Sequence, residues 1–338
     1  MEKYRVGIVG ATGMVGQRFI SLLKDHPWFE VNCVAASARS AGKTYREAVG
    51  ERWAFSWEIP EKVAGMTVVD AADIDEVSKH VDFVFCAVDM KKDEIRALEE
   101  AYAKHEIPVV SNNSACRGIE DVPMVVPEIN ADHLAVIEAQ KKRLGTKSGF
   151  IAVKPNCSIQ SYVPALTPLL DFEPEKVSVC TYQAISGAGK TFKTWPEMVD
   201  NVIPYIGGED EKSENEPLKL WGHVEDGKIV NATLPVISAQ CLRVACSDGH
   251  MAAVSVSFKK KPTIEQIKER WANYETEAQR LELPSAPKPF LQYFEDPSRP
   301  QTRLDRDFQN GFGVSIGRLR EDKLFDYRFV CLSHNTVR

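Results

Sequence analysis

The chain opens its first apolar run with Val6-Gly7-Ile8-Val9-Gly10-Ala11-Thr12-Gly13-Met14-Val15-Gly16, in which a strand passes through a glycine turn into a helix. Glycine at positions 10, 13 and 16 permits a tight turn, lets backbone N–H groups approach a pyrophosphate and lets the helix pack closely on the strand. The spacing is G-x-x-G-x-x-G and departs from the strict G-x-G-x-x-G pattern. A turn glycine with two packing glycines in an ordinary βα unit is therefore the alternative to a dinucleotide site.

Around this stretch, the first 150 residues alternate short β-branched runs with helical patterns, which is typical of βαβ units and a parallel sheet. Later strands alternate in character, as in residues 253–258, which favours a sheet with one solvated or helix-covered face. A chain of 338 residues has room for two domains. We predict an α/β protein, with a Rossmann-like dinucleotide-binding domain over residues 1–150 and an α+β domain with a mainly antiparallel sheet over residues 151–333. Strands are expected at 5–9, 31–36, 66–69, 82–88, 108–111 and 150–153, helices at 15–24, 93–105 and 263–281, and a loop at 283–300.

Composition narrows the class of protein. The formal charge of −6 argues against a general binder of nucleic acid or membrane surfaces. No apolar stretch approaches the roughly 20 residues of a membrane span, and the N-terminus lacks a secretory signal pattern, so we expect a cytoplasmic protein. The eight cysteines are dispersed without a Cys-x-x-Cys pair, so neither disulfides nor a metal site is expected. Four of them lie in apolar runs and are expected in the core: Cys33, Cys86, Cys180 and Cys331.

The end of the second expected strand indicates which dinucleotide is bound. A NAD site usually places an Asp or Glu there to bind the ribose 2′-hydroxyl, but residues 35–43 contain no acid. Ser37, Arg39 and Ser40 instead offer two hydroxyls and a guanidinium, which suit a 2′-phosphate. The alternative is a solvated loop; we predict NADP(H).

A candidate nucleophile lies in Lys154-Pro155-Asn156-Cys157-Ser158, between an expected strand and a helical pattern. At a helix N-terminus, backbone N–H groups and the helix dipole would favour the Cys157 thiolate and an oxyanion beside it. A buried cysteine at a helix cap is an equally good interpretation of this context alone. Further along the chain, Arg243 and His250 stand on either side of an expected turn. Arg243 can hold a carboxylate bidentately, and His250 can act as the acid/base partner of a thiol.

Five motifs in this order along the chain resemble those of aspartate-semialdehyde dehydrogenases, and the likeness extends from Arg5 to Arg338. They are Ser111–Arg117, Pro155-Asn156-Cys157-Ser158, Gln183 before Ser186-Gly187-Ala188-Gly189, Gly208–Lys212, and Arg243 with Gly249-His250. Residues 40–43 and the closing His334–Arg338 resemble the archaeal and fungal branch of that family.

The resemblance implies a reaction: NADPH-dependent reductive dephosphorylation of L-aspartyl 4-phosphate to L-aspartate 4-semialdehyde through a cysteine thioester. This step leads to lysine (by way of diaminopimelate), threonine, methionine and isoleucine. The resemblance makes Cys157 the nucleophile, Gln183 the group that orients substrate or water, and His250 the general acid/base. The implied substrate contacts are Asn112, Arg117, Glu209, Lys212 and Arg243. The implied cofactor contacts are Gly10, Thr12, Gly13, Met14, Val15, Ser37, Arg39, Ser40, Ser186, Gly187 and Asn335.

The resemblance also implies a catalytic and dimerisation role for the second domain, a homodimer or homotetramer, and a return of residues 334–338 to the NADP domain. The family continues past the position of Arg338 with a Gly/Ala-rich loop and a helix, so we expect a less enclosed nicotinamide pocket here.

Three alternatives stay open. A reductase of CoA thioesters, such as malonyl-CoA reductase, has no substrate ammonium for Glu209 to bind. Against an N-acetylglutamyl-phosphate reductase stands the pairing of Arg243 with Glu209, which suits a free α-amino acid. A catalytically silent NADP sensor would have no need of the complete set of Cys157, Gln183, Arg243 and His250.

Overall fold

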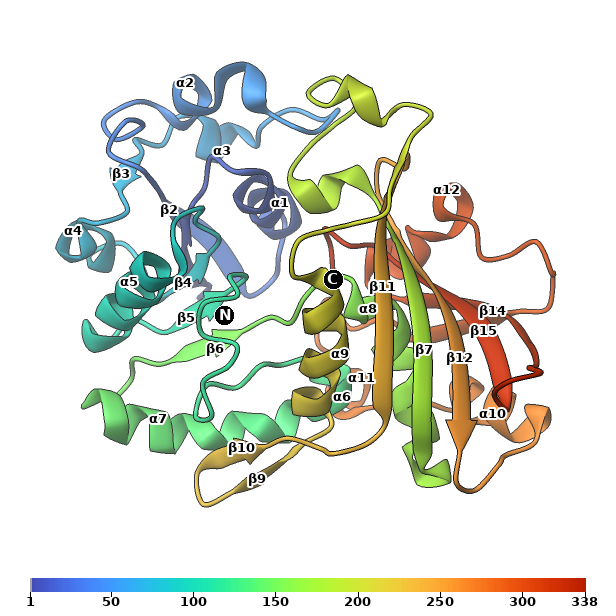
Figure 1. Ribbon diagram of the computed structural model, residues 1–338. Helices are drawn as coiled ribbons and strands as arrows, with labels where there is room; N and C mark the ends of the chain where they lie inside the picture. The colour runs from blue at the N-terminus through green and yellow to red at the C-terminus, as the bar shows by residue number, and fades with distance from the viewer. Residues whose placement is uncertain (1) are drawn as a thin grey trace. The chain divides into compact units, whose positions relative to one another are not determined.

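The computed structural model describes residues 2–338, which form two compact units (Figure 1). Unit 1 contains residues 2–125, 132–154 and 224–229, and unit 2 contains residues 126–131, 155–223 and 230–338. The sequence predicts one boundary near residue 150. The chain passes from unit 1 to unit 2 mainly at Lys154–Pro155, and each unit also contains one short segment from within the other. The sequence does not predict these two segments, because a few residues of ordinary composition carry no pattern that assigns them to the other unit.

Unit 1 is built on a parallel sheet with the strand order β3-β2-β1-β4-β5-β6. This is the order of dinucleotide-binding folds, with the topological switch between β1 and β4, and it confirms the predicted fold class. The predicted strand at 66–69 is shorter and lies further along, as β3. The strands are β1 (Tyr4–Val9), β2 (Phe29–Ala36), β3 (Val69–Asp70), β4 (Phe83–Cys86), β5 (Val109–Ser111) and β6 (Ile151–Val153).

The helices of unit 1 pack an apolar face on this sheet. In α1, Gly16, Ile20 and Leu23 are buried at near-helical spacing, and the helix lies on β1 and β2 beside the core residues Ile8 and Val34. Helix α5 packs on β5 and β6 in the same way. The helices are α1 (Met14–Leu23), α2 (Tyr45–Val49), α3 (Glu61–Ala64), α4 (Ile74–Ser78), α5 (Lys92–Lys104) and α7 (Ile137–Leu144).

Unit 2 is built on a mixed sheet with the order β13-β14-β15-β12-β7-β11-β8. Its pairs are antiparallel except β7 with β11 and β13 with β14. The sheet is therefore mainly antiparallel, as predicted, and the two parallel pairs were not foreseen. The strands are β7 (Pro174–Gln183), β8 (Val202–Ile203), β11 (Val236–Val244), β12 (His250–Phe258), β13 (Leu291–Phe294), β14 (Val314–Glu321) and β15 (Tyr327–Ser333).

Helices cover one side of this sheet. The buried helix α8 packs on β12, β14 and β15, while α9 runs along β11, as Figure 1 also shows. The helices of unit 2 are α6 (Pro127–Asn130), α8 (Ile159–Leu166), α9 (Glu209–Leu220), α10 (Ile264–Ala272), α11 (Glu277–Arg280) and α12 (Thr302–Asp305). A separate two-stranded sheet, β9 (His223–Glu225) with β10 (Lys228–Val230), falls mostly within residues 224–229, which belong to unit 1.

Two local predictions are wrong. The helix expected over residues 263–281 breaks after Ala272, because Thr276 and Gln279 form a capping box that starts a second helix, α11. The loop expected over residues 283–300 contains β13, which enters the core through the fully buried Phe290 and Leu291. Within residues 2–338, no helix is long and apolar enough to cross a membrane.

Candidate active site

The three glycines of the turn after β1 lie in different surroundings and have different structural roles. Gly10 has a φ of +89°, and a Cβ there would lie 2.3 Å from the carbonyl oxygen of Ala87. A Cβ on Gly16 would lie 2.4 Å from the carbonyl oxygen of Gly10, so both positions exclude a side chain. Around Gly13 the nearest atom would be 3.6 Å away, and no side chain caps α1. Internal packing therefore does not require Gly13, and its openness suits the approach of a pyrophosphate to the helix N-terminus.

The turn after β2 presents the groups expected to recognise a 2′-phosphate. Ser37 and Arg39 are exposed, whereas Ser40 is buried and donates its N–H to the carbonyl oxygen of Ser37 at 2.8 Å. Ser37 and Arg39 can therefore meet a ligand directly, while Ser40 closes the turn behind them.

Two predicted substrate residues, Asn112 and Arg117, meet after β5 in unit 1. Arg117 donates from Nη2 to the carbonyl oxygen of Asn112 at 3.1 Å. Beneath this loop, the fully buried Glu99 accepts hydrogen bonds from Ser111 Oγ and, at 3.0 Å, from Asn113 Nδ2. Sequence reasoning missed Glu99, because an acid within the amphipathic pattern of α5 reads as a surface residue.

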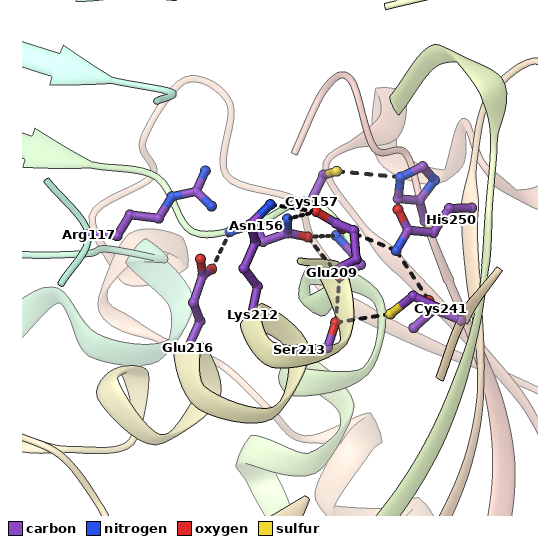
Figure 2. Close-up of polar contacts among 12 residues, drawn as sticks. Arg117, Asn156, Cys157, Glu209, Lys212, Ser213, Glu216, Cys241 and His250 are labelled. Carbon is purple, nitrogen blue, oxygen red and sulfur yellow. Dashed lines mark hydrogen bonds and ion pairs between the residues drawn. The ribbon is translucent and has the colours of Figure 1, made fainter. Parts of the chain in front are cut away.

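Cys157 lies in the turn between β6 and α8, with its Sγ 3.4 Å from His250 Nε2 (Figure 2). It is half-buried. Elsewhere burial raises the pKa of the Cys33 and Cys241 thiols to about 11, which keeps them protonated. Cys33, Cys86 and Cys331 lie in the core as expected, whereas Cys180 is only half-buried.

His250 is the first residue of β12, and the backbone around it is fixed on both sides. Its Nδ1 accepts the N–H of Ala184 at 3.1 Å. The preceding Gly249, with a φ of +96°, donates its N–H to Asn335 Oδ1 at 2.8 Å. Asn335 in turn donates from Nδ2 to Ser186 Oγ at 3.0 Å. Ser186 and Asn335, both predicted cofactor contacts, thus join two loops beside the imidazole.

Gln183 and Arg243 are direct neighbours, because β7 and β11 pair in parallel with these residues in register. Arg243 is buried and donates from Nη1 to the carbonyl oxygen of Ala184 at 2.7 Å. Burial lowers the pKa of Arg243, and the nearby Cys157 and Glu209 act in the opposite direction. Since an arginine starts from so high a value, the guanidinium remains a cation suited to a carboxylate.

Glu209 begins α9 and is the centre of a buried polar cluster. Its carboxylate accepts hydrogen bonds from Asn156 Nδ2 at 2.9 Å and Gln183 Nε2 at 3.2 Å, and pairs with Lys212 Nζ at 2.8 Å (Figure 2). Three donors offset the cost of burying this charge. The predicted substrate residues Glu209 and Lys212 therefore contact each other.

One face of α9 holds the nucleophile turn in place. Besides Glu209, Ser213 Oγ lies 3.0 Å from Ser158 Oγ, and Glu216 accepts the N–H of Asn156 at 2.5 Å. Positions 209, 213 and 216 follow the i, i+4, i+7 pattern of a single helix face. Sequence reasoning missed Ser213 and Glu216, although this polar stripe was a visible signal.

The predicted site residues thus fall into two groups. Unit 2 brings together Cys157, Gln183, Ser186, Gly187, Glu209, Lys212, Arg243, His250 and Asn335. Unit 1 carries Gly10, Thr12, Gly13, Met14, Val15, Ser37, Arg39, Ser40, Asn112 and Arg117. The predicted return of residues 334–338 to the NADP domain stays a prediction. In the structure these residues belong to unit 2, where Arg338 pairs with Glu128 at 3.3 Å.

Comparison with known protein families identifies the class of enzyme to which the chain belongs. The chain matches the NAD-binding domain of semialdehyde dehydrogenases over residues 5–137 and their dimerisation domain over residues 166–338. It is therefore an oxidoreductase with the domain pair of semialdehyde dehydrogenases.

Individual relatives narrow this class. The aspartate-semialdehyde dehydrogenase of Archaeoglobus fulgidus is 43% identical over 99% of this chain and 94% of its own length. That of Schizosaccharomyces pombe is 44% identical over 98% of this chain and 93% of its own length. The crystal structure of the Candida albicans enzyme with NADP has a TM-score of 0.88 at 37% identity and covers 99% of this chain and 94% of that one. The chain belongs to the aspartate-semialdehyde dehydrogenase family, which confirms the predicted resemblance.

Gly187 offers a test of the site geometry. A Cβ there would lie 2.7 Å from Arg243 Nη1 and 2.9 Å from His250 Nε2, between the two groups. We expect Gly187→Ala to lower kcat/KM about 100-fold, since small displacements of reacting groups have effects of this size. Thermal melting should stay near that of the wild type. Gly65→Ala, where a Cβ meets no atom within 4 Å, is the control; equal activity of the two variants would contradict the geometry.

Proposed function

We propose that this chain reduces L-aspartyl 4-phosphate to L-aspartate 4-semialdehyde with NADPH and releases phosphate, the step that feeds lysine, threonine, methionine and isoleucine synthesis. Family membership supports the reaction class. The observation that carries the proposal is that Cys157 Sγ lies 3.4 Å from His250 Nε2, in the same unit as the buried Arg243 cation. This is the arrangement that covalent acyl transfer needs: a nucleophile, a polar group beside it and an anchor for the substrate.

Cys157 forms the covalent intermediate. Its sulfur attacks the acyl carbon, phosphate leaves, and a thioester remains on the enzyme. The N–H groups of the N-terminal turn of α8, which starts just after Cys157, and His250 Nε2 are the groups that can stabilise a tetrahedral oxyanion. Bound NADPH supplies the hydride that reduces the thioester. Gln183, fixed by Thr181 and Glu209, orients the acyl group.

The charges of the substrate match those of the site. Arg243 binds the α-carboxylate and Glu209 the ammonium group, while Arg117 and Lys212 bind the phosphate and Asn112 supports that contact. The Glu209–Lys212 pair supports this assignment, because an arriving ammonium can replace Lys212 on the carboxylate and release it for the phosphate. A CoA thioester has no ammonium group and gives this buried acid no task.

The NADP site is assigned to two turns and to the loops beside His250. Gly10, Thr12, Gly13, Met14 and Val15 bind the pyrophosphate at the start of α1. Ser37 and Arg39 bind the 2′-phosphate directly, and Ser40 contributes to this contact by closing the turn. Ser186, Gly187 and Asn335 bind toward the nicotinamide end. The open approach at Gly13 and the exposed guanidinium of Arg39 support this assignment.

We also propose a cytoplasmic homodimer or homotetramer. The family model for residues 166–338 is a dimerisation domain. Outward-facing apolar residues lie at one edge of the unit 2 sheet, where Val202 on β8 and Val236 on β11 are 54% and 63% exposed. Tyr182 on β7 is also exposed. It lies on the same face because it pairs in register with Leu242 of β11, and Leu242 and Val236 are separated by an even number of positions and therefore point to the same side of the sheet. A second copy of the chain would cover this face.

The first experiment measures NADP⁺ reduction by aspartate semialdehyde in the reverse direction. The rate should depend on phosphate, and CoA should not replace it; activity that needs CoA would overturn the assignment. Cys157→Ser should reduce turnover by about 10³-fold or more while NADP binding is retained, because a hydroxyl is a far weaker nucleophile here. Cys180→Ser is the control and should keep wild-type turnover.

The second experiment tests Arg39. Arg39→Ala should weaken NADP binding by about 10- to 100-fold, the range of a charge-assisted hydrogen bond, and change NAD binding little. Arg46→Ala removes an exposed arginine that pairs with Glu61 at 3.3 Å and serves as the control. Titration of both dinucleotides would show the difference, and an equal loss for NAD would refute the 2′-phosphate contact.

The third experiment measures assembly by sedimentation velocity. Val236→Lys should shift the chain toward monomer, since it places a charge in the proposed interface. Leu324→Lys changes a residue that is 90% exposed between β14 and β15, and should leave assembly unchanged. A wild-type chain that sediments as a monomer would exclude the proposed assembly.

A further inference from the structure

Two buried side chains hold the carbonyl groups of the glycine turn after β1. Tyr45, the first residue of α2, is fully buried and donates from Oη to the carbonyl oxygen of Ala11 at 2.8 Å. Gln17, on α1, is also buried and donates from Nε2 to the carbonyl oxygen of Thr12 at 3.0 Å. Two successive peptide groups of the turn are thus fixed by side chains from two different helices.

Both side chains act as donors in these bonds. A carbonyl oxygen only accepts, so the Tyr45 hydroxyl supplies the hydrogen, and burial raises the pKa of this phenol and keeps the hydrogen in place. The amide nitrogen of Gln17 has a second carbonyl partner, that of Arg52 at 3.1 Å, and its Oε1 accepts the N–H of Ala54 at 2.8 Å. These three partners determine which end of the amide faces Thr12.

The held carbonyl groups determine where the N–H groups of the turn point. In a trans peptide, the C=O and the N–H of the next residue point in opposite directions. Tyr45 is fully buried and approaches the carbonyl of Ala11 from inside unit 1, so the N–H of Thr12 points to the outer side of the turn. The N–H of Gly13 likewise points away from Gln17. The outer side is where Gly13 leaves room for a pyrophosphate.

Without these bonds the turn would have other conformations available, because glycine at positions 10 and 13 gives the backbone unusual freedom. If the peptide group between Ala11 and Thr12 turned over, a carbonyl oxygen would face the anion in place of an N–H, and the two would repel each other. A turn that is already held in its binding conformation loses less conformational entropy when the ligand arrives. Tyr45 and Gln17 therefore contribute to affinity without touching the ligand.

Tyr45 is itself fixed at the end of the segment that carries the proposed 2′-phosphate contacts. Its N–H donates to the carbonyl oxygen of Met66 at 2.8 Å. The preceding Thr44 caps α2 through a capping box with Glu47. Residues 37–45 therefore present the 2′-phosphate contacts at one end and the hydroxyl that holds the glycine turn at the other.

We propose that Tyr45 and Gln17 are positioning residues for the dinucleotide: they hold the carbonyl groups of Ala11 and Thr12 inward, so that the turn presents N–H groups to the pyrophosphate. This role rests on the proposed NADP site. The glycine motif permits the turn, and these two side chains fix its peptide groups. Because NADP and NAD share the pyrophosphate, the two residues affect both dinucleotides equally, in contrast to Arg39.

Binding measurements on Tyr45→Phe, which removes the hydroxyl and keeps the ring, test this role without relying on activity. In calorimetric titrations the Kd values of NADP and NAD should both rise about 5- to 10-fold, the scale of one lost hydrogen bond. Adenosine 2′-monophosphate has the 2′-phosphate but no pyrophosphate, and it should bind as it does to the wild type.

Tyr102→Phe is the matched control. Tyr102 is buried in the same unit and donates to the carbonyl oxygen of Ala71 at 2.8 Å, the same kind of bond at a different place. Both tyrosine variants should lower the melting temperature by similar amounts, since each leaves one carbonyl without its donor. Only Tyr45→Phe should weaken the binding of the dinucleotides.

Gln17→Met gives a second, independent test, with Gln140→Met as its control. Gln140 is buried in unit 1 with the same pattern of three bonds: Nε2 donates to the carbonyl oxygens of Asp121 and Ile151, and Oε1 accepts the N–H of Ile151. Gln17→Met should weaken both dinucleotides, whereas Gln140→Met should weaken neither.

Two results would overturn the proposal. One is that the variants at positions 45 and 17 bind both dinucleotides as tightly as their controls do. The other is that they lose adenosine 2′-monophosphate to the same extent as NADP, which would indicate a general loosening of unit 1. A wild-type chain that binds NADP but reduces it in no phosphate-dependent reaction would refute the proposed reaction and leave this comparison of affinities valid.

Discussion

The register of three strands at the end of β7 is the constraint on which the site depends. Parallel pairing of β11 with β7 sets Arg243 opposite Gln183. Antiparallel pairing of β12 with β7 sets Met251 opposite Tyr182, which places His250, the first residue of β12, beside the end of β7. These residues come from three separate parts of the chain. A slip of one residue in either pairing would turn the side chains to the other face of the sheet. The anchor, the orienting amide and the imidazole are therefore placed by backbone hydrogen bonds before any side chain contributes.

The nucleophile reaches this strand end through a different device. Cys157 sits in a turn that α9 holds by Glu209, Ser213 and Glu216, with Asn156 as the common partner of the two acids. Buried polar groups are costly unless satisfied, and such a network specifies one arrangement of the turn when its members are paired. The residue that we assign to the substrate ammonium thus also supports the nucleophile, so recognition and reactivity share one carboxylate.

Local signals in the sequence were sufficient for part of this structure. The glycine turn at 10, 13 and 16 requires only neighbouring residues, and the first strands and α1 were predicted within a few residues of their observed ends. The cysteine at a helix start and the Arg243…His250 pair could also be recognised. The capping box at Thr276 is a local signal for the helix break, but the amphipathic pattern continues through it and predicts one unbroken helix.

What could not be predicted depends on pairing between distant segments. No local pattern predicts that β7 pairs in parallel with β11, that Lys212 pairs with Glu209, or that the amide of Ala184 meets His250 Nδ1.

The exchange of short segments between the two units has a consequence for biosynthesis. Unit 1 includes Ile229, whose N–H bonds to the carbonyl oxygen of Glu120, and unit 2 includes Glu128, which Tyr274 and Arg338 hold. On the ribosome, the first unit cannot be completed until well into synthesis of the second, so the two must mature as one interdependent product rather than in sequence.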